Sequence, residues 1–233
     1  MNVLPGTWAF RVKRYPNGLI KKLKARFCVR GDRQKEDVDY EKDKTYAPVV
    51  SWTTVQLLLI LSILLGLSTR QVDYTAAFLH APIKEDVYVE CPRGFSSPGK
   101  CLKLKKSLYG LKQSPRNFFE HLKSNLVKCG FQNNQELDPC LFISDKVICL
   151  VYVDDTLFYS PKTEYIDEVV KKLREECHME LEEEDDVAGF LGVDIQDRRN
   201  QEGTITLSQS GLAQGIVEAL NIDHLPRKKK LPQ

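Results

Sequence analysis

Hydrophobic and polar residues alternate with a period of two near the start of the chain. In "TWAFRVKRYPNGLIKKLKARFCVRGDRQ" apolar residues occupy every second position on both sides of a Pro-Asn-Gly sequence at residues 16–18. An Asn-Gly pair between two such runs is the usual signature of a β-hairpin turn. The same periodicity places Lys22, Lys24 and Arg26 on one face of the second strand. The segment therefore predicts a hairpin with one basic face.

Apolar residues at helical spacing predict four helices. Residues 53–67 include the longest apolar run, which is too short to cross a bilayer and predicts a buried helix. A second helix has Ser114 as its N-cap, Pro115 at its first position and Gly130 at its end. Residues 163–177 and a segment around residues 212–220 complete the set.

Strand patterns lie between these helices, in the order strand, helix, hairpin, helix, strand. The first strand belongs to "RQVDYTAAFLHAPI", the hairpin is "KVICLVYVDDTLFYS", and "AGFLGVDIQ" pairs with "GTITLSQ". This order is typical of a split βαβ fold, an antiparallel sheet backed by helices on one face. In such a sheet Asp73, at the end of the first strand, lies beside the turn of the hairpin.

That turn contains two adjacent carboxylates, Asp154 and Asp155, in the most apolar part of the chain. An unpaired buried carboxylate is costly, and two neighbours raise each other's pKa. A divalent cation between them would remove the conflict. A solvated turn is the alternative, because Asp is a common turn residue. The local sequence leaves the two interpretations equally supported.

Composition describes an ordinary globular chain of 233 residues, with 42% hydrophobic and 28% charged residues. The net charge of +2 conceals basic tracts at residues 1–33 and 100–119. Separated basic faces suit a polyanionic partner, although a solvated lysine-rich surface is the simpler alternative. The acidic residues between positions 164 and 186 predict a solvent-facing helix and turn.

Seven scattered cysteines without a C-x-x-C pair argue against a disulfide framework or a zinc site, and for a reducing compartment. The start of the chain has no signal-peptide pattern. We therefore expect a cytoplasmic protein. The basic run at residues 227–230 is either an exposed tail or a targeting signal, so the nucleus is an alternative location.

Three carboxylates on an open sheet face suit phosphoryl transfer. Two divalent ions about 3.5–4 Å apart stabilise the attacking and leaving oxygens of an in-line displacement at phosphorus. Magnesium prefers a few carboxylates together with substrate phosphates. Asp73, Asp154 and Asp155 supply such a set.

An ordered set of motifs resembles the reverse transcriptase domain of copia-type long-terminal-repeat retrotransposons. The motifs are "QVDYTAAFLHAPI", "SLYGLKQSPRNFF", "LVYVDDTLF" and "FLGVDI", preceded by the basic hairpin and "TYAPVV". The resemblance runs from Trp8 to about Leu220. It implies an α+β right-hand polymerase palm with a fingers subdomain, the thumb being largely missing. The implied division is residues 1–50 fingers hairpin, 51–200 palm with interleaved fingers segments, and 201–233 end of the palm or start of the thumb.

The resemblance also implies site residues and cofactors. Asp73, Asp154 and Asp155 look like the catalytic, metal-binding aspartates, served by two Mg²⁺ ions or by Mn²⁺. The implied substrate-binding residues are Lys24, Arg26, Phe78 and Tyr109, with Phe78 as the aromatic gate under the sugar. The residues implied for nucleic-acid binding are Lys112, Arg116, Phe190, Leu191 and Gly192.

The implied activity is RNA-directed DNA synthesis from deoxynucleoside triphosphates on an RNA or DNA template with a primer. No membrane partner is expected. Relatives carry this domain in a Gag-Pol polyprotein with integrase and RNase H, which we expect to be absent from this chain, and an intact element would form a virus-like particle. Two alternatives remain open: a truncated remnant that only binds nucleic acid, and a magnesium-dependent nuclease, in which Lys24, Arg26 and Phe78 would have no role.

Overall fold

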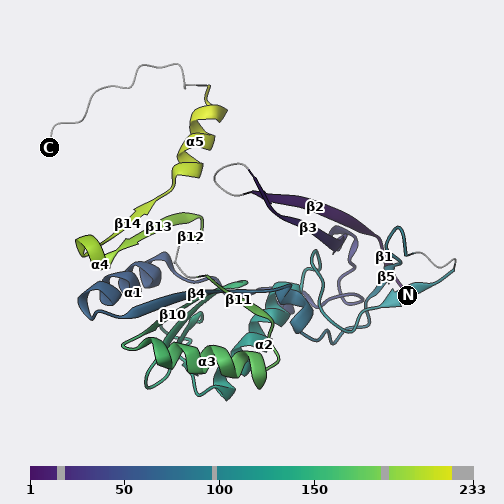
Figure 1. The fold of residues 1–233 in the computed structure, drawn as a ribbon. Coiled ribbons are helices and arrows are strands. Elements are labelled where there is room, and N and C mark those ends of the chain that lie inside the picture. The colour runs from purple at the N-terminus through teal and green to yellow at the C-terminus, as the bar shows by residue number, and fades with distance from the viewer. Residues whose placement is uncertain (15–18, 96–98, 185–188, 222–233) are drawn as a thin grey trace.

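A computed structural model describes residues 1–14, 19–95, 99–184 and 189–221 (Figure 1). The predicted turn at residues 16–18 and the basic run at residues 227–230 lie outside the described residues. The division of the chain into fingers, palm and a terminal segment stays a prediction.

The central sheet is antiparallel, with six strands in the order β11-β4-β10-β9-β8-β7. Their bounds are β4 Ser68–Tyr74, β7 Gln132–Asn133, β8 Leu141–Ile143, β9 Ile148–Tyr152, β10 Asp155–Ser160 and β11 Leu181–Glu184. The chain passes from β4 through α2 to the β9–β10 hairpin, and then through α3 to β11. The predicted split βαβ order is therefore confirmed.

The last strand of this unit differs from the expected one. β11 comes from the acidic tract that we predicted to form only a helix and a turn, and it pairs with β4. The predicted strands "AGFLGVDIQ" and "GTITLSQ" instead form a separate sheet. The sequence of β11, Leu-Glu-Glu-Glu, has a low strand propensity, so only its pairing with β4 makes it a strand.

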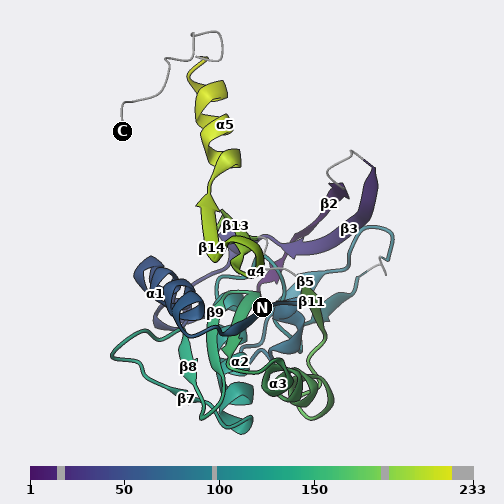
Figure 2. The same ribbon diagram turned by 60° about the vertical axis from the view of Figure 1, so that its left-hand side comes forward.

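Helices α2 (Ser114–Lys128) and α3 (Thr163–Glu175) lie together on one side of the central sheet (Figures 1 and 2). Their buried apolar stripes include Phe118, Leu122, Leu126, Ile166, Val170 and Leu173. The predicted cap of α2 is wrong, because Ser114 is already helical and its hydroxyl donates to the carbonyl of Leu108 at 2.6 Å. Gly130 follows the end of α2 with a φ of 95°, as expected for a helix stop.

Helix α1 (Trp52–Leu64) is buried on one face only. Val55, Leu58 and Leu59 lie in the core, but Leu57, Ile60 and Leu64 are exposed. The prediction of a buried helix is therefore wrong for the outer half of α1, which no part of the described chain covers. None of the described helices has the length and apolar character needed to cross a bilayer.

Smaller elements surround this core. They are β1 Val3–Leu4, β5 Tyr88–Glu90 and β6 Cys101–Lys103 in one sheet, β12 Gly189–Phe190, β13 Val193–Arg198 and β14 Thr204–Ser208 in another, the hairpin β2 Gly6–Arg14 with β3 Ile20–Val29, helices α4 Arg199–Glu202 and α5 Ser210–Ala219, and the 3-10 turns Gly31–Arg33, Lys42–Lys44 and Ala77–His80. The β2–β3 hairpin and the β12–β14 sheet lie on the side of the central sheet opposite α2 and α3 (Figure 1).

The predicted β2–β3 hairpin turns its basic face toward the rest of the molecule. Phe10 and Leu23, on its apolar face, are 77% and 71% exposed. Lys24 and Arg26, on the opposite face, are half-buried. The basic face of the hairpin is therefore turned toward the central sheet, and its apolar face is turned toward solvent.

Candidate active site

Two of the three predicted aspartates are neighbours in the central sheet. Asp73 near the end of β4 pairs in register with Asp155 at the start of β10. Residues paired in this way on adjacent antiparallel strands have side chains on the same face, with Cβ atoms about 4.5–5.5 Å apart. Asp73 and Asp155 thus come together although 82 positions separate them in the sequence.

The third aspartate lies in the hairpin turn. Tyr152 pairs with Asp155, which leaves Val153 and Asp154 as a two-residue turn. The carbonyl of Asp154 accepts a hydrogen bond from the backbone N–H of Tyr74 at 3.1 Å, so the turn is fixed against the end of β4. Val153 has a φ of 53°, which is strained for a β-branched residue. The pairing of β9 with β10 and the hydrogen bond from Tyr74 hold this turn in an unfavourable conformation.

The surroundings of Tyr109 show that these groups converge. Burial raises the pKa of the Tyr109 phenol, the guanidinium of Arg26 opposes this shift, and the carboxylates of Asp154 and Asp73 add to it. One phenol therefore lies within electrostatic range of two of the predicted aspartates and of Arg26. Among the described residues no group of three His, Cys, Asp or Glu side chains is arranged so that it could hold a metal ion.

Sequence reasoning missed Gln71. It lies two residues before Asp73, on the same face of β4, and is almost fully buried. Its amide nitrogen donates to the backbone carbonyl of Gly189 at 3.0 Å and to Oδ1 of Asp155 at 3.4 Å. Gln71 thus connects the carboxylates to the start of β12. The sequence did contain a signal for Gln71, because a residue two positions before Asp73 lies on the same face of a strand.

Three of the predicted substrate-binding residues are in contact. The rings of Phe78 and Tyr109 have centroids 4.7 Å apart, and the guanidinium of Arg26 lies 5.0 Å from the centroid of Tyr109. Phe78 also contacts Phe118 of α2 edge to face at 6.2 Å. Phe78 is therefore half-buried at the border of the core. This position is compatible with its predicted role as a gate and equally with a simple packing role.

A close backbone contact positions Tyr109 beside β3. The N–H of Val29 donates to the carbonyl of Tyr109 at 2.8 Å. Gly110 has a φ of 93°, and a Cβ at this position would lie 2.1 Å from the carbonyl oxygen of Val29. Only glycine allows this approach. Gly110 therefore lets the loop that carries Tyr109 come close enough to β3 for Arg26 to lie over the Tyr109 ring.

The basic face of β3 meets an acidic residue that sequence reasoning did not select. Glu182 of β11 pairs in register with Asp73, on the side of β4 opposite Asp155. Its Oε1 accepts a hydrogen bond from Nζ of Lys22 at 3.2 Å. Asp155, Asp73 and Glu182 thus form an acidic row across three strands. No local pattern of residues indicated this row, because β11 was not predicted to be a strand.

Lys112 and Arg116 are engaged within the chain. Lys112 donates to the hydroxyl of Tyr40 at 3.0 Å and lies over its ring. Arg116 donates to the carbonyl of Tyr46 and pairs with Glu120 at 2.8 Å. Both side chains are partly exposed, and their predicted contact with nucleic acid stays a prediction.

The segment Phe190-Leu191-Gly192 forms the turn between β12 and β13. The ring of Phe190 is buried against Tyr152, with centroids 5.8 Å apart. Leu191 and Gly192 occupy the turn itself with positive φ angles. The buried ring anchors the turn, so Leu191 and Gly192 are the parts of the segment available to a ligand.

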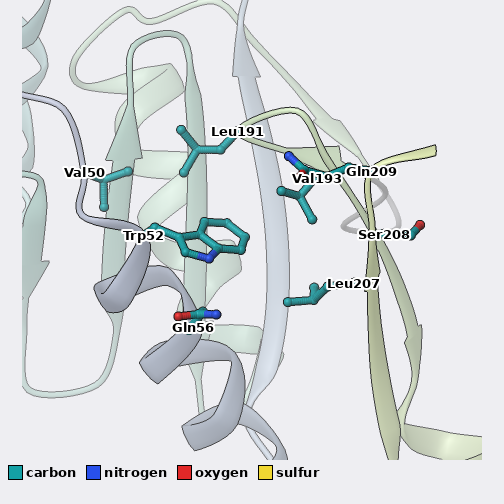
Figure 3. A pocket seen from close by; sticks show the side chains of 8 residues that line it. All are labelled: Val50, Trp52, Gln56, Leu191, Val193, Leu207, Ser208 and Gln209. Carbon is teal, nitrogen blue, oxygen red and sulfur yellow. The ribbon is translucent and has the colours of Figure 1, made fainter. Parts of the chain in front are cut away.

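A pocket of about 610 Å³ lies beside this turn, between α1 and the β13–β14 strands. Figure 3 shows Trp52 of α1 facing Leu191, Val193 and Leu207 across it. Of the predicted site residues, only Leu191 lines this pocket; the aspartates and the predicted substrate-binding residues do not.

Comparison with known proteins places these features in a family. Residues 1–230 match the family model described as "Reverse transcriptase (RNA-dependent DNA polymerase)". The chain is 36% identical over 158 residues to the retrovirus-related Pol polyprotein from transposon TNT 1-94 of Nicotiana tabacum, covering 64% of this chain and 12% of that protein. It is 32% identical over 219 residues to the transposon Ty1-ER2 Gag-Pol polyprotein of Saccharomyces cerevisiae, covering 89% and 12%.

The chain thus spans about an eighth of the length of the curated relatives that it matches. Among solved structures, the RNA-dependent RNA polymerase of bacteriophage phi12 aligns over 89% of this chain and 45% of its own, at 6% identity and a TM-score of 0.47.

Proposed function

Because this chain belongs to the reverse transcriptase (RNA-dependent DNA polymerase) family, we propose that it is the palm and fingers of an RNA-directed DNA polymerase from a retrotransposon polyprotein. Its substrates are a primed RNA or DNA template and deoxynucleoside triphosphates. One observation carries the proposal: Asp73 and Asp155 are paired in register, Asp154 lies in the adjoining turn, and the basic face of β3 looks onto them.

The three carboxylates suit magnesium by their chemistry, because magnesium prefers a few carboxylate oxygens completed by substrate phosphates. In the described chain they are not grouped closely enough to form a site by themselves, so the nucleotide would complete it. Asp73, Asp154 and Asp155 would hold the ions, with Mn²⁺ as an alternative to Mg²⁺. When bound, two such ions supply charge stabilisation to the attacking and leaving oxygens at phosphorus. The buried amide of Gln71, which donates to Asp155, holds that carboxylate in place.

The remaining residues act on the nucleotide. Lys24 and Arg26 share the face of β3 that looks onto the carboxylates, and they bind the triphosphate, Arg through a bidentate contact and Lys as a point charge. The rings of Phe78 and Tyr109, which contact each other at a tilt of 49°, lie under the sugar and leave no room for a 2′-hydroxyl. Lys112, Arg116 and the Leu191-Gly192 turn contact the template and primer.

Replacement of Asp154 by Asn tests the catalytic part of this proposal. Asp154→Asn should abolish primer extension, because the turn loses a metal-binding carboxylate, while the melting temperature stays the same or rises as repulsion is relieved. Asp145→Asn is the matched control, since Asp145 lies in the preceding turn, between β8 and β9, at the opposite end of β9 from the candidate site. Extension by the Asp154 variant at the wild-type rate would refute the proposed role.

The same assay distinguishes the polymerase from the inactive remnant. The unmodified chain is mixed with primed template, and binding and extension are measured together. Binding without extension would favour a remnant that only binds nucleic acid.

A further inference from the structure

An ion pair joins the β2–β3 hairpin to the central sheet next to the candidate active site. Nζ of Lys22 on β3 lies 3.2 Å from Oε1 of Glu182 on β11, and 160 positions separate the two residues. The side chains are 52% and 60% exposed, so an incoming solute can reach both. Neither residue belongs to the catalytic set proposed above.

Register places both residues beside that set. Glu182 lies opposite Asp73 across the β4–β11 pair, and Asp155 lies opposite Asp73 on the other side. Lys22 is two residues from Lys24 and four from Arg26, so the three cations share one face of β3. We call these three cations the basic row. The ion pair therefore joins Lys22, at one end of the basic row, to Glu182, at one end of the acidic row.

Arg26 at the other end of the basic row is also engaged. Its guanidinium covers the ring of Tyr109 at 5.0 Å. Two cations of the face proposed to grip the triphosphate are thus occupied by partners within the chain, Lys22 by a carboxylate and Arg26 by an aromatic ring.

We propose that Lys22 is a third triphosphate-binding cation, that Glu182 holds it in position while no nucleotide is bound, and that the triphosphate takes Lys22 from Glu182. This inference rests on the proposed function of the site. An exposed ion pair contributes little free energy, and a triphosphate offers several negative charges where Glu182 offers one. Glu182 then sets the affinity for nucleotide through Lys22.

Equilibrium binding of dTTP separates this role from that of an ordinary surface ion pair. The full chain is bound to a template with a dideoxy-terminated primer, so that no extension occurs, and the dTTP dissociation constant is measured. Lys22→Gln should weaken binding about two- to fivefold, and Glu182→Gln should tighten it by a similar factor because Lys22 is released. In the Lys22→Gln background Glu182→Gln should have no effect.

The pair Lys103–Asp86 is the matched control. Its atoms are 2.6 Å apart, its side chains are 50% and 67% exposed, and Lys103 lies on β6 in a different sheet. Lys103→Gln and Asp86→Asn should leave the dissociation constant unchanged. An unchanged constant for Lys22→Gln would overturn the inference, and so would a Glu182→Gln effect that persists without Lys22.

Amide hydrogen exchange provides a second measurement that does not depend on activity. Glu182→Gln should speed exchange in β3, because the strand loses its ion pair with β11. dTTP should instead slow exchange in β3 of the wild-type chain, because the triphosphate binds Lys22, and it should slow it less in Lys22→Gln. If the wild-type chain neither binds dTTP nor extends a primer, the proposed function itself fails. If wild-type binding is normal and β3 exchange does not respond to either change, only the role of Lys22 and Glu182 is overturned.

Discussion

Phe78 lies where it could act both as a gate under the sugar of the nucleotide and as a packing residue of the core. Its ring is half-buried, contacts Tyr109 on the side of the site, and contacts Phe118 on the side of the core. It lies two residues after Ala76, which adopts a left-handed conformation with a φ of 52° where the chain leaves β4. A ring in this position can exclude a 2′-hydroxyl and also contribute packing energy.

Phe78→Val should therefore change both nucleotide choice and stability. Ribonucleotide incorporation should rise roughly 10- to 100-fold relative to deoxynucleotide incorporation, because the space under the sugar opens. The free energy of unfolding should fall by about 1–3 kcal/mol from the lost ring contacts. Incorporation of both substrates and the melting temperature are measured on the same purified variant.

Phe118→Val is the control for this change. Phe118 is 1% exposed in α2 and lies beneath Phe78. Its replacement should lower stability without altering the preference between the two sugars. An unchanged preference in the Phe78 variant would show that Phe78 acts only as a core residue.

At the scale of elements, the position of the β2–β3 hairpin depends on a backbone contact with the loop that carries Tyr109. The hydrogen bond from Val29 to the Tyr109 carbonyl and the positive φ of Gly110 bring the two segments together. Gly31 contributes to the same contact, since a Cβ there would lie 1.9 Å from the carbonyl oxygen of Gly110. This contact places Arg26 over Tyr109.

Gly110→Ala should separate these segments. The methyl group would meet the Val29 carbonyl and would also sit on a backbone conformation that alanine disfavours, so we expect a loss of roughly 2–4 kcal/mol in unfolding free energy. The KM for nucleotide should rise, because Arg26 loses its position. Chemical denaturation and steady-state primer extension measure the two effects.

Gly203→Ala isolates the backbone contribution. Gly203 has a φ of 67°, and a methyl group added there would have no atom of the described chain within 4 Å. Only conformational strain of about 1–2 kcal/mol is therefore expected. Equal losses in the two variants, with an unchanged KM, would mean that the close contact at Gly110 does not position the hairpin.

For the whole molecule, a net charge of +2 conceals a cluster of cations on the β2–β3 hairpin, which lies next to the acidic row of Asp155, Asp73 and Glu182. The basic face of the hairpin is turned toward the sheet, whereas α3, with four acidic and three basic residues, lies on the opposite side (Figure 1). This cluster of cations favours approach of a polyanion from the hairpin side. Lys112 and Arg116 contribute less freely, because both already have partners within the chain.

Binding of a primed template should therefore depend steeply on salt and little on sequence, since phosphate contacts dominate. Arg11→Gln should reduce the slope of log affinity against log salt by about one, because Arg11 lies opposite Lys24 on the basic face. Lys171→Gln on α3 should leave the slope unchanged. A flat salt response of the wild-type chain would mean that these lysines and arginines are only solvated surface.

Local periodicity and chain order by themselves determined much of this molecule. Alternation identified the β2–β3 hairpin, an apolar run interrupted by two aspartates identified the β9–β10 hairpin, and helical spacing identified α2 and α3. The order of these elements restricts the chain to a split βαβ sheet, and that topology brings Asp73 to the turn with Asp154 and Asp155. These features could be predicted because each depends on short-range geometry or on a rule of strand connection.

The tertiary structure alone decided features that depend on a distant partner. β11 is a strand because β4 offers it unpaired backbone groups, although its own glutamates disfavour that state. The outer half of α1 is exposed although its sequence is apolar on every side, and the hairpin turns its basic face inward. Pairing, burial and ion pairs between segments far apart in sequence are set by the assembled surfaces, so the acidic row that includes Glu182 exists only in the folded chain.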